Sequence, residues 1–235
     1  MQAQPSIQPQ PSHALVKRLA QIIGTLALTM SLFFLGAGRL DIPMAWVYIA
    51  VYLIYLVVIA LIMHDPELIK ERSHTPADAK PWDRKLMKVY GLCVLAMFFA
   101  SGLNVGRLPQ SPQVPPPLQI VALSVGILSL GLIGWAMRTN TFFSTVVRIQ
   151  AERGHHVIDT GPYRYVRHPG YVAMIGSIIA TPLVFGSVWG LIPAALAAGI
   201  IGARTVVEDR TLQAELPGYT AYTRRVRYRL LPGIW

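Results

Sequence analysis

The sequence predicts an all-α, polytopic helical membrane protein with about six helical arms, of which the last two form a tight hairpin. Three observations support this fold class. Of the 235 residues, 53% are hydrophobic and only 14% are charged, whereas about a quarter of the residues in a soluble domain are charged. The apolar residues gather in long uncharged stretches. The basic residues gather in alternate connections between those stretches.

Five stretches contain no Asp, Glu, Lys or Arg: residues 19–38, 42–63, 89–106, 118–137 and 171–203. The first four approach the roughly 20 apolar residues that a helix needs to cross a bilayer. None shows the alternation of a membrane β-barrel strand. The first stretch is too long for the apolar core of a signal peptide, so we interpret it as a membrane helix. The polar residues 1–14 are expected to form a disordered cytoplasmic tail.

The fifth stretch is too long for a single crossing. Its 33 residues would form a helix of roughly 50 Å, against a hydrocarbon core of about 30 Å. Pro182, Gly186, Gly190 and Pro193 supply helix breaks near its midpoint. We therefore expect a hairpin with two arms of about 15 residues each, which leaves open whether the hairpin fully crosses the bilayer.

The basic residues predict a topology. If the last stretch is a hairpin, all 21 Lys and Arg residues except Arg39 and Arg107 lie on one side of the membrane. The positive-inside rule then places both termini, residues 64–88 and residues 138–170 in the cytoplasm. Because this distribution accounts for the net charge of +10, we do not expect nucleic-acid binding. The single cysteine, Cys93, excludes an intramolecular disulfide framework.

The expected domains are the tail (1–14), N-terminal membrane helices (15–137) and a C-terminal core (138–235). The core contains TGPYRYVRHPGYVAM, residues 160–174, whose Arg, His and Tyr residues a lipid-facing helix does not require. A hairpin returns Arg204 and Glu208, which share a helix face, to the membrane boundary where this stretch begins. Ionisable side chains at membrane depth are candidates for function.

These residue types suit a ligand that carries a carboxylate, a cation and an aromatic ring. Arginine or histidine can bind the carboxylate, Glu208 the cation and a tyrosine the ring face. S-adenosyl-L-methionine has all three groups, and a lipophilic acceptor could reach it from the bilayer. The same residues also have purely structural explanations. Arg204 could serve only to keep its end of the helix on the cytoplasmic side, and the tyrosines could lie at the membrane–water interface, where aromatic residues are common. No spacing indicates a metal site or a Rossmann nucleotide motif.

Two motifs carry a resemblance to a known family. GHHVIDTGPYRYVRHPGY and RTVVEDRTLQAELPGYTAYTRRVRYRLLPGIW resemble, in this order, the isoprenylcysteine carboxyl methyltransferase (ICMT) family in its bacterial branch, over about residues 138–235. The resemblance implies an integral membrane enzyme that uses S-adenosyl-L-methionine to methylate a lipophilic acceptor. In eukaryotic members the acceptor is the C-terminal carboxylate of a prenylated cysteine. The implied partners are such a substrate and membrane lipids.

The resemblance also implies roles for individual residues. The residues expected to bind the cofactor are His155, His156, Val157, Ile158, Tyr163, His168, Pro169, Gly170, Tyr171 and Glu208. Arg204 is expected to contact the substrate carboxylate, and Arg167 to support the same pocket, as the catalytic pair; no metal is expected. Two positions depart from the family pattern. Arg148 stands where eukaryotic members have a glutamine of the cofactor site, and Asp209 stands where the family often has a second glutamate.

Three alternatives stay open. Phospholipid N-methyltransferases have a similar Arg-His-Pro-x-Tyr and Glu motif, but an amine acceptor would favour an acidic or aromatic pocket, so Arg204 favours a carboxylate. Membrane sterol-type reductases have a comparable His-Pro-x-Tyr stretch and use NADPH. A scaffold or lipid carrier would use only the basic face and would leave the Tyr-His-Pro cluster unexplained. The sequence does not name the acceptor.

Overall fold

The computed structural model describes residues 11–62, 65–74, 76 and 78–235. Its helices are α1 (Pro11–Ala37), α2 (Pro43–Ile62), α3 (Pro66–Ser73), α4 (Pro81–Gly102), α5 (Pro116–Thr139), α6 (Pro169–Val184), α7 (Leu191–Glu215) and α8 (Tyr219–Arg225), with the short helical segments η1 (Leu103–Arg107), η2 (Ala151–Arg153) and η3 (Gly161–Arg164). No strand occurs among the described residues, so the predicted all-α class is confirmed. Helix α1 begins at Pro11, so residues 11–14 of the expected disordered tail are helical, and residues 1–10 lie outside the described residues.

The helix starts are marked by proline, because each of α1 to α6 begins with one. Proline is favoured at the first helical position, where its fixed φ suits the helix and its missing N–H has no partner to lose. At α3 the preceding Asp65 adds a side-chain cap, accepting from the backbone N–H groups of Glu67 (3.0 Å) and Leu68 (3.2 Å). Local sequence therefore explains where these helices begin.

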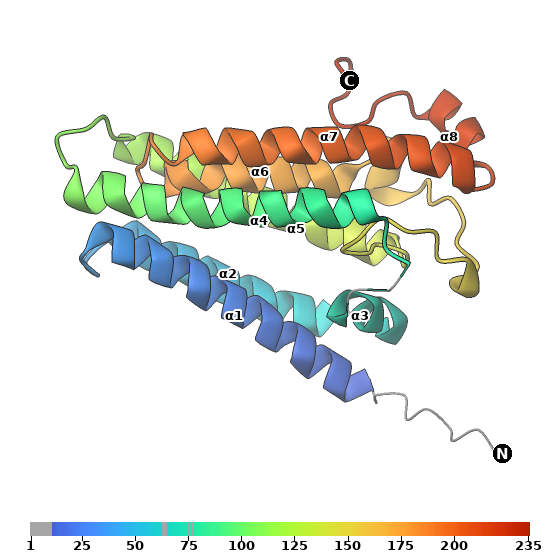
Figure 1. Ribbon diagram of the computed structural model, residues 1–235, viewed down its shortest axis with the longest axis horizontal. Coiled ribbons are helices and arrows are strands. Elements are labelled where there is room, and N and C mark those ends of the chain that lie inside the picture. The colour runs from blue at the N-terminus through green and yellow to red at the C-terminus, as the bar shows by residue number, and fades with distance from the viewer. Residues whose placement is uncertain (1–10, 63–64, 75, 77) are drawn as a thin grey trace.

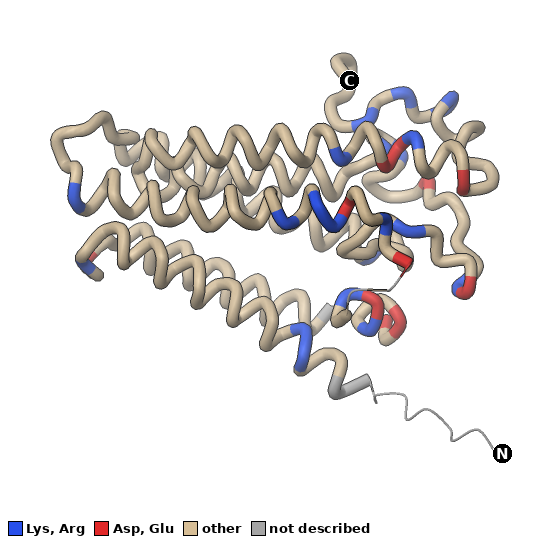
Figure 2. Tube along the Cα trace, viewed as in Figure 1, with Lys and Arg blue, Asp and Glu red and all other residues tan. Residues whose placement is uncertain are grey.

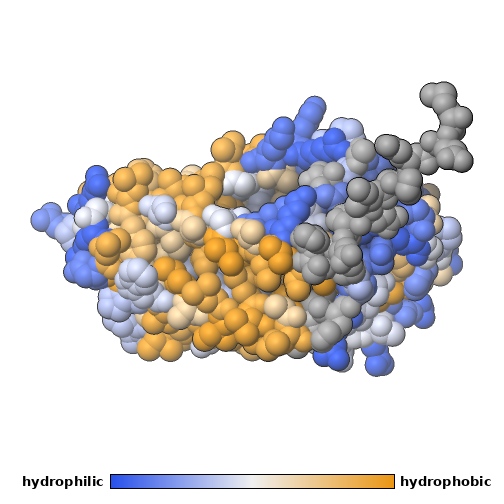
Figure 3. Space-filling view, turned by 90° about the horizontal axis from the view of Figure 1, so that it is seen from below, coloured by the Kyte–Doolittle hydropathy of each residue, from blue (hydrophilic) through white to orange (hydrophobic). Residues whose placement is uncertain are grey.

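Five helices in the described part of the chain are long and apolar enough to cross a bilayer: α1, α2, α4, α5 and α7. Helix α6 is apolar but has only 16 residues. The surface matches this assignment, with a broad hydrophobic band between hydrophilic ends (Figure 3). Exposed leucines such as Leu28, Leu53 and Leu128 belong to the lipid-facing surface. The chain is a multi-pass membrane protein.

The helices form two layers, with α1 and α2 in one layer and α4 to α7 in the other (Figure 1). The contact of α1 with α4 depends on glycine. A Cβ atom on Gly102 would lie 2.0 Å from the carbonyl oxygen of Phe33, and one on Gly36 would lie 2.5 Å from that of Phe99. Small residues let membrane helices approach until their backbones touch.

The predicted hairpin is present, because α6 and α7 run side by side and are joined by residues 185–190 (Figure 1). Asn104 of η1 is fully buried and holds this turn. Its Oδ1 accepts hydrogen bonds from Oγ of Ser187 (2.9 Å) and from the backbone N–H groups of Val188 (2.9 Å) and Trp189 (3.2 Å). The turn is thus fixed by the connection after α4 as well as by its own glycines, Gly186 and Gly190.

Helix α7 differs from the expected arm of about 15 residues, because it continues past the uncharged stretch to Glu215. Its C-terminal part carries the charged residues that the sequence places after the hairpin. Arg204 and Asp209 are buried there. Each forms an ion pair with another protein side chain, which replaces the contact with water. The second arm therefore extends as a continuous helix from the membrane into the polar end of the bundle.

Charged residues gather at one end of the bundle, which contains α3, α8, the α5–α6 connection and the end of α7 (Figure 2). We call this the base-rich end. At the opposite end of the described structure, Arg39 pairs with Asp41 (3.2 Å) and Arg107 donates to the carbonyl oxygen of Leu35 (3.1 Å). The asymmetry of the charge along the helices therefore follows the distribution expected from the sequence.

Candidate functional site

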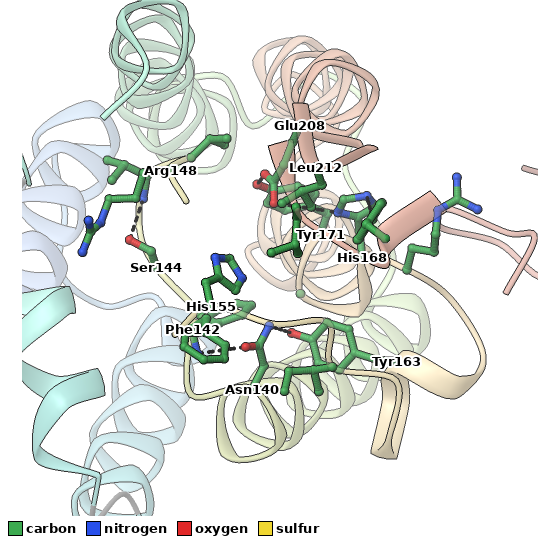
Figure 4. Close-up of a pocket in the computed structure, with 18 of the residues that line it drawn as sticks. Asn140, Phe142, Ser144, Arg148, His155, Tyr163, His168, Tyr171, Glu208 and Leu212 are labelled. Carbon is green, nitrogen blue, oxygen red and sulfur yellow. Dashed lines mark hydrogen bonds and ion pairs between the residues drawn. The ribbon is translucent and has the colours of Figure 1, made fainter. Parts of the chain in front are cut away.

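A cavity of about 240 Å³ opens at the base-rich end, between α6, α7 and the connection that precedes α6. We call it the polar cavity. Figure 4 shows Glu208, Tyr171 and His168 on one side, with His155 and Phe142 facing them across the cavity. The first group comes from the hairpin and the second from the connection before it. The hairpin therefore brings Glu208 back to Tyr171 and His168, which lie 37 and 40 positions before it in the chain, as expected from its return to the same end.

The polar cavity collects nearly all of the residues expected to bind a cofactor. Those that line it are His155, His156, Val157, Ile158, Tyr163, His168, Gly170, Tyr171 and Glu208. Pro169 is buried at the first position of α6, where it starts the helix, and is not part of the lining. Both members of the expected catalytic pair, Arg167 and Arg204, line the cavity.

Glu208 is the only acidic residue in the lining described here. Its carboxylate accepts a hydrogen bond from the hydroxyl of Tyr171, and its Oε1 lies 4.0 Å from Nδ1 of His168. The side chain keeps 20% exposure. The rings of His168 and Tyr171 stack, with centroids 5.5 Å apart and planes at 5°. Glu208 thus offers a carboxylate oxygen to a ligand beside a flat pair of rings.

The neighbouring Asp209 is fully buried and is not part of the cavity lining. It accepts from Nε and Nη2 of Arg167 (2.8 and 2.9 Å), from Nε of Arg229 (3.0 Å) and from the hydroxyl of Tyr219 (3.1 Å). Nε2 of His168 lies 3.2 Å from the same carboxylate. Asp209 therefore ties α7 to the C-terminal segment and orients the His168 ring from the side opposite Glu208.

Every nitrogen of the Arg167 guanidinium binds a protein atom. Besides the pair with Asp209, Nη1 donates to the carbonyl oxygens of Val226 and Arg227, both at 2.8 Å. The backbone N–H of Arg167 also donates to the carbonyl oxygen of Tyr228 (3.0 Å). This geometry makes Arg167 a positioning residue, which holds the C-terminal segment against the start of α6.

Arg204 is buried, and its charge is compensated by the fully buried Asp83 of α4. Nε and Nη2 of Arg204 donate to the Asp83 carboxylate at 2.7 and 3.0 Å, and Nη2 also donates to the carbonyl oxygen of Thr145 (3.1 Å). The guanidinium carbon lies 5.2 Å from the centroid of the Tyr171 ring. Nη1 makes no hydrogen bond to any described residue, which leaves it for a ligand in the cavity.

Sequence reasoning missed Asp83 as the partner of Arg204. A signal was present, because Asp83 is an acid close to the start of the uncharged stretch 89–106, and a basic residue buried at a membrane boundary needs a counter-charge. Sequence reasoning also missed the aromatic and polar lining residues Asn140, Phe142, Tyr219 and Tyr222. These types carry no pattern that separates a cavity wall from an ordinary core.

Opposite Glu208 the wall is built by His155 and Phe142. Their rings stack with centroids 4.5 Å apart. The backbone N–H of Gln150 donates to Nδ1 of His155 (3.3 Å). Burial, with a smaller contribution from the neighbouring His156, lowers the pKa of His155 to about 4. The His155 ring is therefore neutral at neutral pH and offers an uncharged face to the cavity.

Tyr163 links the connection before α6 to its surroundings. Its hydroxyl accepts from Nδ2 of Asn140 (3.2 Å), and its carbonyl oxygen accepts from the hydroxyl of Tyr222 (2.6 Å). Burial raises the pKa of Tyr163 above its ordinary value, so the phenol stays protonated. Tyr163 thus contributes a neutral aromatic wall that is fixed at both ends.

Arg148 occupies the position where the family resemblance expected a glutamine. It pairs with Glu71 (2.9 Å), Asp78 (2.8 Å) and Glu152 (2.6 Å). The hydrogen bonds from Arg148 to Glu71 and its other carboxylate partners raise the pKa of this guanidinium. Arg148 lines the polar cavity while holding α3 against the connection before α6.

A second cavity of about 340 Å³ lies within the bundle, and we call it the apolar cavity. Residues from α1 to α6 line it, mainly Leu, Ile, Met, Phe and Tyr. Arg72 of α3 and Met174 of α6 line both cavities. The polar site therefore adjoins a hydrocarbon-lined space in the membrane part of the protein.

A comparison with protein-family models matches this part of the chain. The model of the isoprenylcysteine carboxyl methyltransferase (ICMT) family matches residues 122–214. The matched segment runs from α5 through the hairpin and contains His168, Tyr171, Arg204 and Glu208. A search of curated proteins found no match. The family match confirms the resemblance predicted from the two motifs: residues 122–214 of this multi-pass membrane protein match the model of the isoprenylcysteine carboxyl methyltransferase family.

Proposed function

We propose that this protein uses S-adenosyl-L-methionine to methylate the carboxylate of a lipophilic acceptor, in an isoprenylcysteine-type O-methylation. One observation carries the proposal: a polar cavity whose single acid is Glu208 adjoins an apolar cavity inside the membrane bundle. A charged cofactor and a lipid can therefore occupy neighbouring spaces. Because the base-rich end carries nearly all Lys and Arg residues, we place the polar cavity and both termini on the cytoplasmic side.

The lining residues fit this cofactor in charge and shape. The partly exposed Glu208 carboxylate suits a cationic or amino group, and the stacked pairs His168–Tyr171 and His155–Phe142 suit an aromatic ring. His155, His156, Val157 and Ile158 line the same cavity from the connection before α6. When bound, S-adenosyl-L-methionine supplies an electrophilic methyl group, whose transfer to a carboxylate oxygen yields a methyl ester and S-adenosylhomocysteine.

The protein residues act by orienting groups and excluding water. An ionised carboxylate is already a nucleophile, so no strong base is needed. Nη1 of Arg204 can donate to the acceptor carboxylate, while Asp83 balances the arginine charge. Because this pair carries no net charge, Arg204 can orient the acceptor oxygen by hydrogen bonding. Arg167 acts indirectly, through Asp209 and the orientation of His168.

The test uses the full chain purified in detergent. S-adenosylhomocysteine is expected to raise the melting temperature, and NADPH is expected to leave it unchanged. Incubation with S-adenosyl-L-methionine labelled in its methyl group and a membrane lipid extract is expected to give a labelled lipid, to be identified by mass spectrometry. A methyl ester releases its label as methanol in alkali, whereas a methylated amine keeps it. Stabilisation by NADPH alone, or a product stable to alkali, would contradict the proposal.

A further inference from the structure

Four arginines line the polar cavity, and three of them have carboxylate partners. Arg148 pairs with Glu71, Arg167 with Asp209 and Arg204 with Asp83. The fourth, Arg72, has no carboxylate within ion-pair distance, and all eleven Asp and Glu residues of the chain lie in the described structure. Arg72 is therefore the one lining arginine without an ion-pair partner in the described structure.

The surroundings of Arg72 offer little to replace a counter-charge. Nη1 donates one hydrogen bond to the carbonyl oxygen of Phe143 (3.3 Å), and the guanidinium carbon lies 5.1 Å from the centroid of the Phe143 ring. The guanidinium is partly buried. Burial, followed by repulsion from Arg18, lowers the pKa of Arg72 to about 10. A partly buried cation without an ion-pair partner is costly, so this site favours an anionic ligand.

The position of Arg72 indicates where that anion would lie. Arg72 lines both cavities, together with Met174, and Arg18 lines the apolar cavity on the same side. An amphiphile whose hydrocarbon chain fills the apolar cavity would therefore place its head group at the junction beside Arg72. The base-rich end supplies positive charge at this point, and the rest of the apolar cavity supplies the hydrophobic contact.

We propose that Arg72 binds the anionic head group of the acceptor at the junction of the two cavities, with the acceptor chain in the apolar cavity, and thereby selects acidic lipids as substrates. This inference rests on the proposed function. It divides two tasks between two arginines. Arg204, balanced by Asp83, orients the reacting carboxylate, and Arg72 supplies the net charge that attracts it. Arg72 lies outside the family-matched residues 122–214, so this selectivity belongs to the N-terminal part of the chain.

The test measures methyl transfer to a membrane lipid extract that has been separated by anion exchange into acidic and neutral fractions. Wild type is expected to methylate the acidic fraction only. In Arg72→Met, the amount of acidic fraction needed for half-maximal rate is expected to rise about tenfold or more, the effect of losing a hydrogen bond from a charged group. The maximal rate should change little, and Arg72→Lys, which keeps the charge, should recover part of the affinity.

Controls separate this inference from the proposed function. Arg138→Met removes an exposed arginine at the end of α5 that lines neither cavity, and it should leave the rates unchanged. S-adenosylhomocysteine binding and thermal unfolding should be the same in Arg72→Met and wild type, which shows that the variant is folded. No methyl transfer and no S-adenosylhomocysteine binding in wild type would overturn the proposed function and this inference with it.

One further outcome would overturn the inference alone: methyl transfer by Arg72→Met with the wild-type dependence on the acidic fraction. Equal use of neutral and acidic lipids by wild type would overturn both this inference and the carboxylate acceptor of the proposed function. An anionic phospholipid that copurifies with wild type and is lost from Arg72→Met, without a kinetic change, would assign Arg72 to a structural lipid instead.

Discussion

Arg204 and Asp83 form a buried, two-hydrogen-bond ion pair that joins α7 to α4 across 121 positions of sequence, with nitrogen–oxygen distances of 2.7 and 3.0 Å. The same carboxylate accepts from the backbone N–H of Val147 (2.9 Å) and so also holds the connection before α6. The pair thus places a ligand-facing arginine on a fixed support. It connects the stability of the bundle to the shape of the polar cavity.

Asp83→Asn is expected to destabilise the protein by about 3–5 kcal/mol, because it leaves Arg204 as an uncompensated buried charge. Thermal unfolding in detergent measures this. The double variant Asp83→Asn with Arg204→Met should recover much of the loss. Glu215→Gln is the matched control: it removes a partly exposed ion pair with Lys80 and should cost less than about 1 kcal/mol. An equal loss in both single variants would show that burial of the pair is not the cause.

Glu208→Gln is expected to weaken S-adenosylhomocysteine binding by about tenfold or more, because the cavity loses its one carboxylate. Calorimetry on the detergent-solubilised protein measures the change. The melting temperature without ligand should stay close to wild type, since Glu208 has Tyr171 as its hydrogen-bonding partner and is partly exposed. His168→Ala should also weaken binding, through loss of the stacked ring. Wild-type affinity in Glu208→Gln would remove Glu208 from the cofactor site.

His155 is expected to titrate near pH 4 in the folded protein, rather than near its ordinary value of 6.5. Its folded pKa is lowered, so the unfolded chain binds more protons between pH 4 and 6.5. The contribution of the neutral His155 ring to the free energy of unfolding is therefore complete above about pH 6.5. This contribution is lost as the pH falls toward 4. NMR of the histidine ring measures the pKa, and His155→Phe should remove this part of the pH dependence. A midpoint near 6.5 would contradict the burial of this ring.

Asn104→Ala is expected to cost about 1–3 kcal/mol, because three donors of the α6–α7 turn lose a buried acceptor. Thermal unfolding measures the cost, and limited proteolysis should show cleavage at residues 185–190. Asn104→Asp keeps the acceptor oxygen and should be cleaved less than the alanine variant. Unchanged protection of the turn in Asn104→Ala would show that the turn's own residues are sufficient.

Gly102→Ala is expected to destabilise the protein by about 1–3 kcal/mol, because the new Cβ would meet the carbonyl oxygen of Phe33 and push α1 from α4. Gly91→Ala in the same helix is a matched control, since no atom lies within 4 Å of a Cβ there. That variant should be neutral or stabilising by up to about 1 kcal/mol, from higher helix propensity. Comparable losses in the two variants would exclude the close helix contact as the cause.

Much of the architecture follows from the sequence. The uncharged stretches, their lengths and the prolines predict the membrane helices and their starts, because these depend on short-range properties that any lipid-embedded backbone must satisfy. The excess length of the stretch 171–203 predicts the hairpin, and the hairpin in turn predicts that Arg204 and Glu208 return to His168 and Tyr171. The two motifs add the family, which the match over residues 122–214 confirms.

Only the tertiary structure decided which charges neutralise one another. Asp83 pairs with Arg204 and Asp209 with Arg167, whereas Arg72, which lines both cavities, has no ion-pair partner in the described structure. Residue types and spacing indicate which side chains reach the same end of a bundle. The pairing within that end depends on the distances between helices, which are set by contacts such as that of Gly102 with Phe33. An ion pair forms only where packing brings the two groups within about 4 Å. The separation of two residues along the chain therefore does not predict whether they pair.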